Sequence, residues 1–306
     1  MMPTSLNRRE FLTRAIVSGT GATLAMSSLT WAADRPGIKR VKLSTPNAEK
    51  LGWRICCQLY TFRDRSFYET LEVLSGIGVR LVEPAFFLPL SKEQPGLKTG
   101  ESLAPDKRRE MKQRMNELGI GMPNYYAPIE ADKRAYRKVF DFAKEMGVET
   151  LVAEPPLEAF ETLDGLCQEY KINLAVHNHP EGSGSKYWNP DTLMNACEGR
   201  SARIGACPDT GHWVRSGLDT LESLRKYQKR IITAHLKDAA ESGKRDSRDV
   251  PLGTGKANFA ALLQQFYDWK WRGVMTVEYE YLSPQLVPEF TQCVKFVEDF
   301  ATNARK

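Results

Sequence analysis

All four histidines of this 306-residue chain lie in short polar stretches that each follow an apolar run. The sequence reads Ala175-Val-His-Asn-His-Pro180 in the first stretch, Asp209-Thr-Gly-His212 in the second and His235-Leu-Lys-Asp238 in the third. A fourth stretch begins at Glu278. Imidazole and carboxylate groups without a Cys-x-x-Cys pair are typical ligands of Mn, Fe, Co, Ni or Zn, and suit Mg less well. The pattern therefore predicts a site for one divalent metal ion.

Short β-rich runs alternate with amphipathic helical stretches from residue 53 onward, and this alternation must position the polar stretches. Eight strands are expected at residues 53–60, 78–83, 120–125, 149–154, 172–177, 202–209, 231–236 and 273–278. Helices are expected at residues 67–75, 105–118, 133–146, 157–170, 190–197, 218–228, 258–269 and 287–301.

Such alternation indicates an α/β fold with a parallel sheet, because parallel neighbours need a crossover connection. Eight units favour a single (β/α)8 TIM barrel. An open doubly wound sheet is the alternative, but no Gly-x-Gly-x-x-Gly motif follows an early strand. In a barrel, the C-terminal ends of the strands meet at the active site. The histidine-bearing stretches follow the fifth, sixth and seventh strands, and Glu278 ends the eighth.

The barrel pattern and the strand ends of residues 53–300 resemble the sugar phosphate isomerase/epimerase family, with its xylose-isomerase-like barrel. The motifs that carry the resemblance are Asp209-Thr-Gly-His212, His235-Leu-Lys-Asp238, Glu278-Tyr-Glu280 and the loop Gly253-Thr-Gly255. The resemblance implies one divalent ion (Mn, Co, Zn, Fe or Mg) held by Glu, Asp, His and Glu. Asp209, His235 and Glu278 match the last three ligands. His177 stands where the first glutamate is expected, as in a subgroup that has histidine there.

The resemblance also implies a chemistry, since the family's epimerases use two metal-bound glutamates on opposite faces of the sugar. Only Glu278 remains here, so Glu154 at the end of strand four is the candidate for the second carboxylate, as base or further ligand; alternatively it caps the next helix. Proton removal next to a carbonyl builds charge on oxygen, and a divalent cation stabilises the resulting enediolate. Lys237 is a candidate to neutralise that oxygen, or else it pairs with Asp238.

Four further side chains are expected to contact the substrate: His179, His212, Trp213 and Tyr60. The implied function is an exported metal-dependent sugar isomerase or epimerase acting on a small sugar or glycoside. A keto-glycoside lyase or hydrolase on the same scaffold and a non-catalytic sugar-binding protein remain alternatives. Glu83 and Tyr125 end the second and third strands without an assigned role. The stretch Gly253-Thr-Gly-Lys256 lacks P-loop spacing and is expected to be a turn.

The N-terminal region is expected to lie outside the barrel. Residues 1–33, with paired arginines, a mildly apolar run and a final Ala-Ala, resemble a twin-arginine export signal, which implies a periplasmic protein. Residues 34–50 are expected to form an extended arm before a barrel at 51–306.

Charge, hydropathy and cysteine usage exclude several classes of protein. The net charge is +5, and removal of residues 1–33, with their three Arg and one Glu, leaves +3. This charge is too small to favour nucleic acid, and a repair nuclease of this barrel type would need more histidines. No segment after the leader approaches the roughly 20 apolar residues of a membrane span. The six cysteines show no disulfide framework, and a homo-oligomer remains open.

Overall fold

The computed structural model describes residues 42–130 and 132–304. The expected export signal and the first part of the expected arm therefore lie outside the described residues. The eight strands of the barrel are β1 (Trp53–Gln58), β2 (Val82–Glu83), β3 (Asn124–Tyr126), β4 (Thr150–Ala153), β5 (Asn173–His177), β6 (Ile204–Cys207), β7 (Thr233–Leu236) and β10 (Gly273–Val277).

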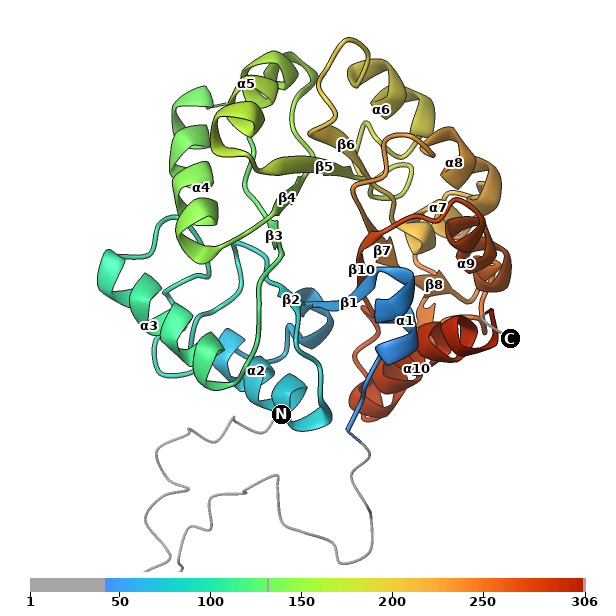
Figure 1. Ribbon diagram of the computed structural model, residues 1–306, viewed down its shortest axis with the longest axis horizontal. Coiled ribbons are helices and arrows are strands. Elements are labelled where there is room, and N and C mark those ends of the chain that lie inside the picture. The colour runs from blue at the N-terminus through green and yellow to red at the C-terminus, as the bar shows by residue number, and fades with distance from the viewer. Residues whose placement is uncertain (1–41, 131, 305–306) are drawn as a thin grey trace, which may run out of the picture. The chain divides into compact units, whose positions relative to one another are not determined.

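Parallel pairing closes these strands into a ring (Figure 1). Ladders join the strands in the orders β2-β1-β10-β7 and β3-β4-β5-β6. Parallel bridges between Leu81 and Gly121, and between Ala206 and Ile231, join the two sets. The predicted (β/α)8 barrel is confirmed.

Helices lie around the outside of the strands (Figure 1). They are α2 (Phe67–Ile77), α3 (Pro105–Glu117), α4 (Lys133–Met146), α5 (Phe160–Tyr170), α6 (Pro190–Ala196), α7 (Thr210–Arg215), α8 (Thr220–Lys226), α9 (Phe259–Asp268) and α10 (Leu286–Asn303). Short 3-10 turns cover Leu59–Phe62 and Leu157–Ala159. Local sequence fixes several ends: Ser66 and Glu69 form a capping box on α2, and Gly147 ends α4 in the left-handed conformation.

The prediction of an extended arm is wrong for residues 46–50, because they belong to the helix α1 (Pro46–Leu51), which packs on α10. Pro46 opens this helix and Gly52, at φ 83°, closes it. The Asn47 side chain donates to Glu298 at 2.8 Å and to Thr302 at 3.0 Å. These contacts tie the helix to the barrel.

Three other departures from the predicted elements have local causes. Strand β3 begins only at Asn124, because Pro123 before it has no N–H to donate. A short antiparallel hairpin of β8 (Asp238–Ala239) and β9 (Asp249–Val250) follows β7. Helix α7 begins directly after Asp209, where no helix was expected, and β6 ends at Cys207, two residues before the expected end of the strand. Both additions lie at the C-terminal ends of the strands.

All six cysteines are buried and unpaired, in agreement with the expectation of buried thiols. Burial raises the pKa of Cys167 and Cys293 to about 12 and that of Cys197 and Cys207 to about 11. The pKa values of Cys56 and Cys57 also lie well above the usual range, because both thiols are fully buried. Among the described residues, no helix is long and apolar enough to cross a membrane.

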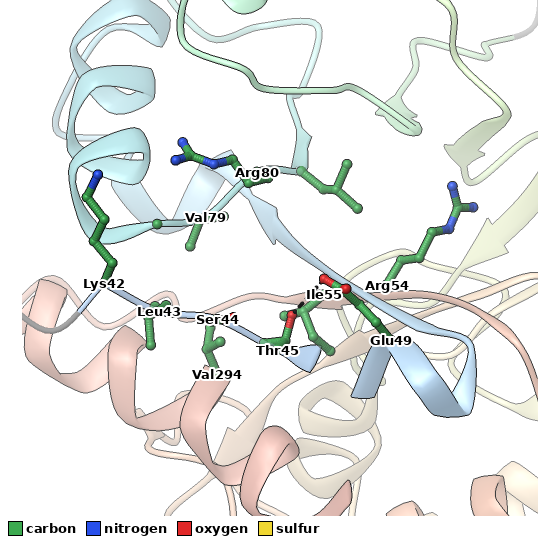
Figure 2. A pocket seen from close by; sticks show the side chains of 12 residues that line it. Lys42, Leu43, Ser44, Thr45, Glu49, Arg54, Ile55, Val79, Arg80 and Val294 are labelled. Carbon is green, nitrogen blue, oxygen red and sulfur yellow. Dashed lines mark hydrogen bonds between the residues drawn. The ribbon is translucent and has the colours of Figure 1, made fainter. Parts of the chain in front are cut away.

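A cavity of about 540 Å³ lies at the N-terminal ends of β1 and β2, where residues 42–45 pass beneath the barrel (Figure 2). Its arginines are engaged with the protein. Arg54 forms a two-pronged ion pair with Glu149 at 2.6 and 2.7 Å, and Arg80 donates to the Leu118 carbonyl at 3.3 Å. Side chains at this end of a TIM barrel serve stability, so we place the chemistry at the opposite end.

Candidate metal centre

The four predicted metal ligands converge at the C-terminal end of the barrel. His177 ends β5, Asp209 follows β6, His235 lies in β7 and Glu278 follows β10. All four are buried, and one donor atom from each lies within 4.8 Å of the others. His177 Nε2 lies 3.5 Å from Asp209 Oδ2, and His235 Nδ1 lies 3.0 Å from Glu278 Oε2. The structure thus assembles the predicted donor set.

His177 Nε2 is buried without a hydrogen-bond partner, and Asp209 Oδ2 has none besides its ion-pair contact with Lys237 Nζ at 3.1 Å. Buried polar atoms normally find partners, so the unpartnered nitrogen, 3.5 Å from that oxygen, needs an explanation. Two imidazoles and two carboxylates in one buried cluster fit a divalent transition metal. The residues present therefore fit the implied cofactor.

Asp209 is held rigidly, because its other atoms belong to the fold. Its Oδ1 accepts from the backbone N–H of His212 at 2.9 Å and caps the start of α7. Its backbone N–H donates to Asn178 Oδ1 at 2.9 Å. Only Oδ2 is left to face the cluster.

Glu154 lies behind His177 and does not cap the next helix. Its Oε1 accepts from His177 Nδ1 at 3.2 Å and from His179 Nδ1 at a shorter separation. Burial opposes the ionisation of Glu154, but the two histidines hold the pKa of this carboxyl well below its usual range. A neutral imidazole that donates through Nδ1 presents Nε2 as an acceptor, which is how carboxylates orient metal-binding histidines.

His235 has a similar support in Glu83, a residue to which the sequence assigned no role. His235 Nε2 lies 2.7 Å from Glu83 Oε1, so Nδ1 faces the cluster. Glu83 is fully buried and also accepts from Gln58 (3.2 Å), Asn124 (3.0 Å) and Thr276 (3.1 Å). Its position at the end of the second expected strand was the one available signal.

Lys237 is fully buried among acidic side chains. Its Nζ donates to Glu280 at 2.9 Å and lies 3.1 Å from Asp209 and 3.2 Å from Glu278. The alternative prediction, that Lys237 pairs with Asp238, is wrong. Burial opposes the ionisation of Glu278, but the Lys237 ammonium and the His235 ring lower the pKa of this carboxyl to about 2.

Asp238 has a structural task instead. Its carboxylate accepts from the backbone N–H groups of four residues at 2.9 to 3.0 Å: Ala239, Gly253, Gly255 and Ala257. These bonds fold the glycine-rich stretch into a turn beside the barrel mouth, as expected for a stretch that is not a phosphate loop.

A cavity of about 490 Å³ opens onto the cluster. Three of the predicted substrate contacts line it, namely Tyr60, His179 and His212, together with His177 and Glu278. Glu280 lines it as well.

The prediction that Trp213 contacts the substrate is wrong, because its side chain is fully buried and packs on Tyr227 at 5.5 Å between ring centroids. Neighbouring residues on a helix point in different directions. The early start of α7 at Thr210 therefore turns His212 toward the cavity and Trp213 into the core.

Arg215, which the sequence analysis did not single out, braces this side of the cavity. Its guanidinium donates to Asp249 at 2.6 Å and to Glu280 at 2.8 Å, and lies 3.1 Å from His212 Nδ1. The Lys237 Nζ lies 3.1 Å from the other ring nitrogen, His212 Nε2, so each nitrogen of this imidazole faces a cationic donor. Burial keeps the pKa of His212 well below its usual value. His212 is therefore a neutral imidazole between two cations beside the cluster.

Comparison with known proteins agrees with this geometry. A family model described as "Xylose isomerase-like TIM barrel" matches residues 71–295. An inosose dehydratase of Clostridium perfringens is 26% identical over 195 residues, which cover 50% of this chain and 65% of that protein. The chain spans 48 to 65% of the length of the curated relatives it matches.

Solved structures share the barrel. A D-tagatose 3-epimerase-like protein superimposes with a TM-score of 0.65 at 17% identity, covering 83% of this chain and 100% of that one. The IOLI protein, solved with a bound zinc atom, gives a TM-score of 0.60 at 16% identity, covering 82% and 98%. At these identities the likeness concerns the fold.

Proposed function

Because this chain belongs to the xylose isomerase-like TIM barrel family, we propose that it is a divalent-metal-dependent sugar isomerase or epimerase that removes a proton next to a carbonyl. The observation that carries the proposal is the buried cluster of two histidines and two carboxylates, with its unpartnered His177 Nε2, beneath an open cavity. A bound divalent ion would polarise a carbonyl oxygen of the substrate and stabilise negative charge on it.

His177, Asp209, His235 and Glu278 would hold that ion, with Glu154 and Glu83 fixing the orientation of the two imidazoles. The Lys237 ammonium, within 3.2 Å of Asp209 and Glu278, adds positive charge beside the same oxygen. His212 lines the same cavity and would contact the substrate there.

Proton transfer needs a group that reaches the cavity. Glu278 lines the cavity and is the first candidate base, because its carboxylate is ionised at neutral pH and reaches the space that a substrate would occupy. Glu154 is engaged with two histidines, so it acts through His179, whose side chain is 43% exposed and whose Nε2 is left free by the bond to Glu154. Glu278 and His179 then form the pair that removes and returns the proton.

A second candidate function, elimination from a keto-sugar or keto-glycoside, is favoured by the similarity to a protein named inosose dehydratase. Elimination begins with the same proton removal, and His179 would then protonate the departing oxygen instead of a carbon. Export by the signal expected at residues 1–33 belongs to the proposal too, and cell fractionation tests it.

Metal analysis and solvent isotope exchange test the proposal together. We expect about one divalent ion per chain in the wild type, loss of that ion in Asp209→Ala, and its retention in Asp106→Ala, an exposed aspartate on α3. In deuterated water, a panel of ketoses and keto-glycosides should reveal deuterium uptake next to a carbonyl. Isomerised sugar supports the first function, and release of the aglycone or of water supports the second.

A wild type that holds no ion and gains no stability from Mn, Co or Zn would refute the metalloenzyme assignment. A bound ion without isotope exchange on any of these substrates would contradict the isomerase proposal and favour the non-catalytic sugar-binding protein.

A further inference from the structure

The cavity above the cluster is divided into two chemically different halves. Strands β5, β6, β7 and β10 supply the metal ligands and the charged groups beside them. The ends of β1, β2 and β3 contribute three aromatic rings on the other side, those of Tyr60, Phe87 and Tyr126. Tyr126 joins the halves, since its ring meets that of His177 at 5.5 Å between centroids.

Two rings of the aromatic half are in contact. Tyr60 and Phe87 pack edge to face with centroids 5.8 Å apart. The guanidinium of Arg63 lies over the Tyr60 ring at 4.5 Å and fixes its position. Phe87 remains 40% exposed and is one of few large apolar side chains with this exposure among the described residues. A phenylalanine that lines a cavity and stays exposed offers ring surface to a ligand.

The neighbouring polar side chains are already committed to the protein. Gln58 accepts from the Tyr60 backbone N–H at 2.7 Å and donates to Glu83 at 3.2 Å. Arg63 donates to the carbonyl oxygens of Tyr60 and Glu280 at 3.3 and 2.7 Å. Beyond the phenolic oxygens, this half therefore offers apolar ring faces to a ligand.

The size of the cavity fits a ligand larger than one sugar. Its volume of about 490 Å³ falls within the roughly 300–1,000 Å³ typical of sites for drug-sized ligands. A monosaccharide placed at the metal ligands would fill only part of this volume.

We propose that the natural substrate is a two-ring glycoside, whose sugar lies at the metal cluster and whose aromatic or apolar second ring packs on Phe87 and Tyr60. This inference rests on the proposed function, because it assumes that the polar half receives a sugar. It names Phe87 as a specificity-determining residue.

Calorimetric binding of phenyl and methyl β-glucosides and β-galactosides to the metal-loaded full chain tests the inference. We expect the phenyl glycoside of at least one sugar to bind roughly two- to tenfold tighter than its methyl counterpart. In Phe87→Ala the ratio of the methyl to the phenyl dissociation constant should fall to near one. In Leu157→Ala, a change at a similarly exposed leucine (42%) outside the cavity, the preference should persist.

Absence of any phenyl preference in the wild type, including absence of binding, would overturn the inference, and so would an undiminished preference in Phe87→Ala. Because no turnover is needed, a phenyl preference without isotope exchange would contradict the proposed function and leave the aromatic subsite standing.

Discussion

Replacement of Glu83 by alanine should destabilise the protein and weaken its metal site, although Glu83 itself is not a predicted ligand. The change removes the acceptor for four buried donors. Asn124 keeps a bond to Thr233 at 2.9 Å, and the Thr276 hydroxyl can rotate. Gln58 Nε2 and His235 Nε2 have no other oxygen or nitrogen partner among the described residues, and the Cys207 thiol beside the His235 ring is only a weak acceptor.

The magnitude follows from those two stranded donors. Each buried unsatisfied donor costs about 1–3 kcal/mol, so we expect Glu83→Ala to lower the free energy of unfolding by about 2–6 kcal/mol. His235 also loses the group that orients it, and loss of such a partner weakens metal binding by roughly 10- to 100-fold.

Glu83→Gln is the matched control. Its amide oxygen can still accept from Gln58 and His235, and its NH2 group can donate to Asn124 Oδ1, which is buried without a partner and can turn to receive it. We expect a cost of about 1 kcal/mol and nearly unchanged metal affinity.

Guanidinium unfolding of the metal-free proteins and competition titration with a chelator measure the two effects. Equal losses in the alanine and glutamine variants would show that the charge of Glu83 matters and not its hydrogen bonds. An alanine variant with wild-type stability and metal affinity would refute the reasoning altogether.

Other predictions follow from the same geometry. Asp238→Ala should cost several kcal/mol in chemical denaturation, because four backbone N–H groups lose one acceptor; a cost no larger than that of a surface substitution would contradict this. Trp213→Phe should change stability alone, and calorimetry that showed weakened sugar binding would restore Trp213 as a substrate contact. In metal-free protein, the lowered pKa of Glu278 stabilises the fold fully above about pH 4.5, and this contribution is lost as pH falls toward 2. Unfolding of Glu278→Gln at pH 4.5 and 2.5 should therefore show a smaller pH dependence than the wild type.

The barrel and the ligand cluster could be predicted because both depend on local pattern. Strand and helix periods are short-range, and parallel strands in a barrel bring their C-terminal ends together. Once His177 and His235 were placed at strand ends, their convergence with Asp209 and Glu278 followed from topology.

The supporting residues could not be found in the same way, because their partners are distant in sequence. Glu83 and His235 are 152 positions apart, and Arg215 and Glu280 are 65 apart. Trp213 was misplaced because its direction depends on the residue at which α7 begins. The early end of β6 and the Asp209 cap decide that start, and strand propensity alone does not reveal them.

The six sealed thiols have a consequence for how this protein matures. A thiol reacts as its thiolate, and burial with pKa values at or above about 11 leaves almost none of that form at neutral pH. The native barrel (residues 42–130 and 132–304) therefore contains no disulfide that an oxidant would have to form, and its buried thiols react little with oxidants. The folded state itself therefore contains no bond that a reducing environment would break among the described residues.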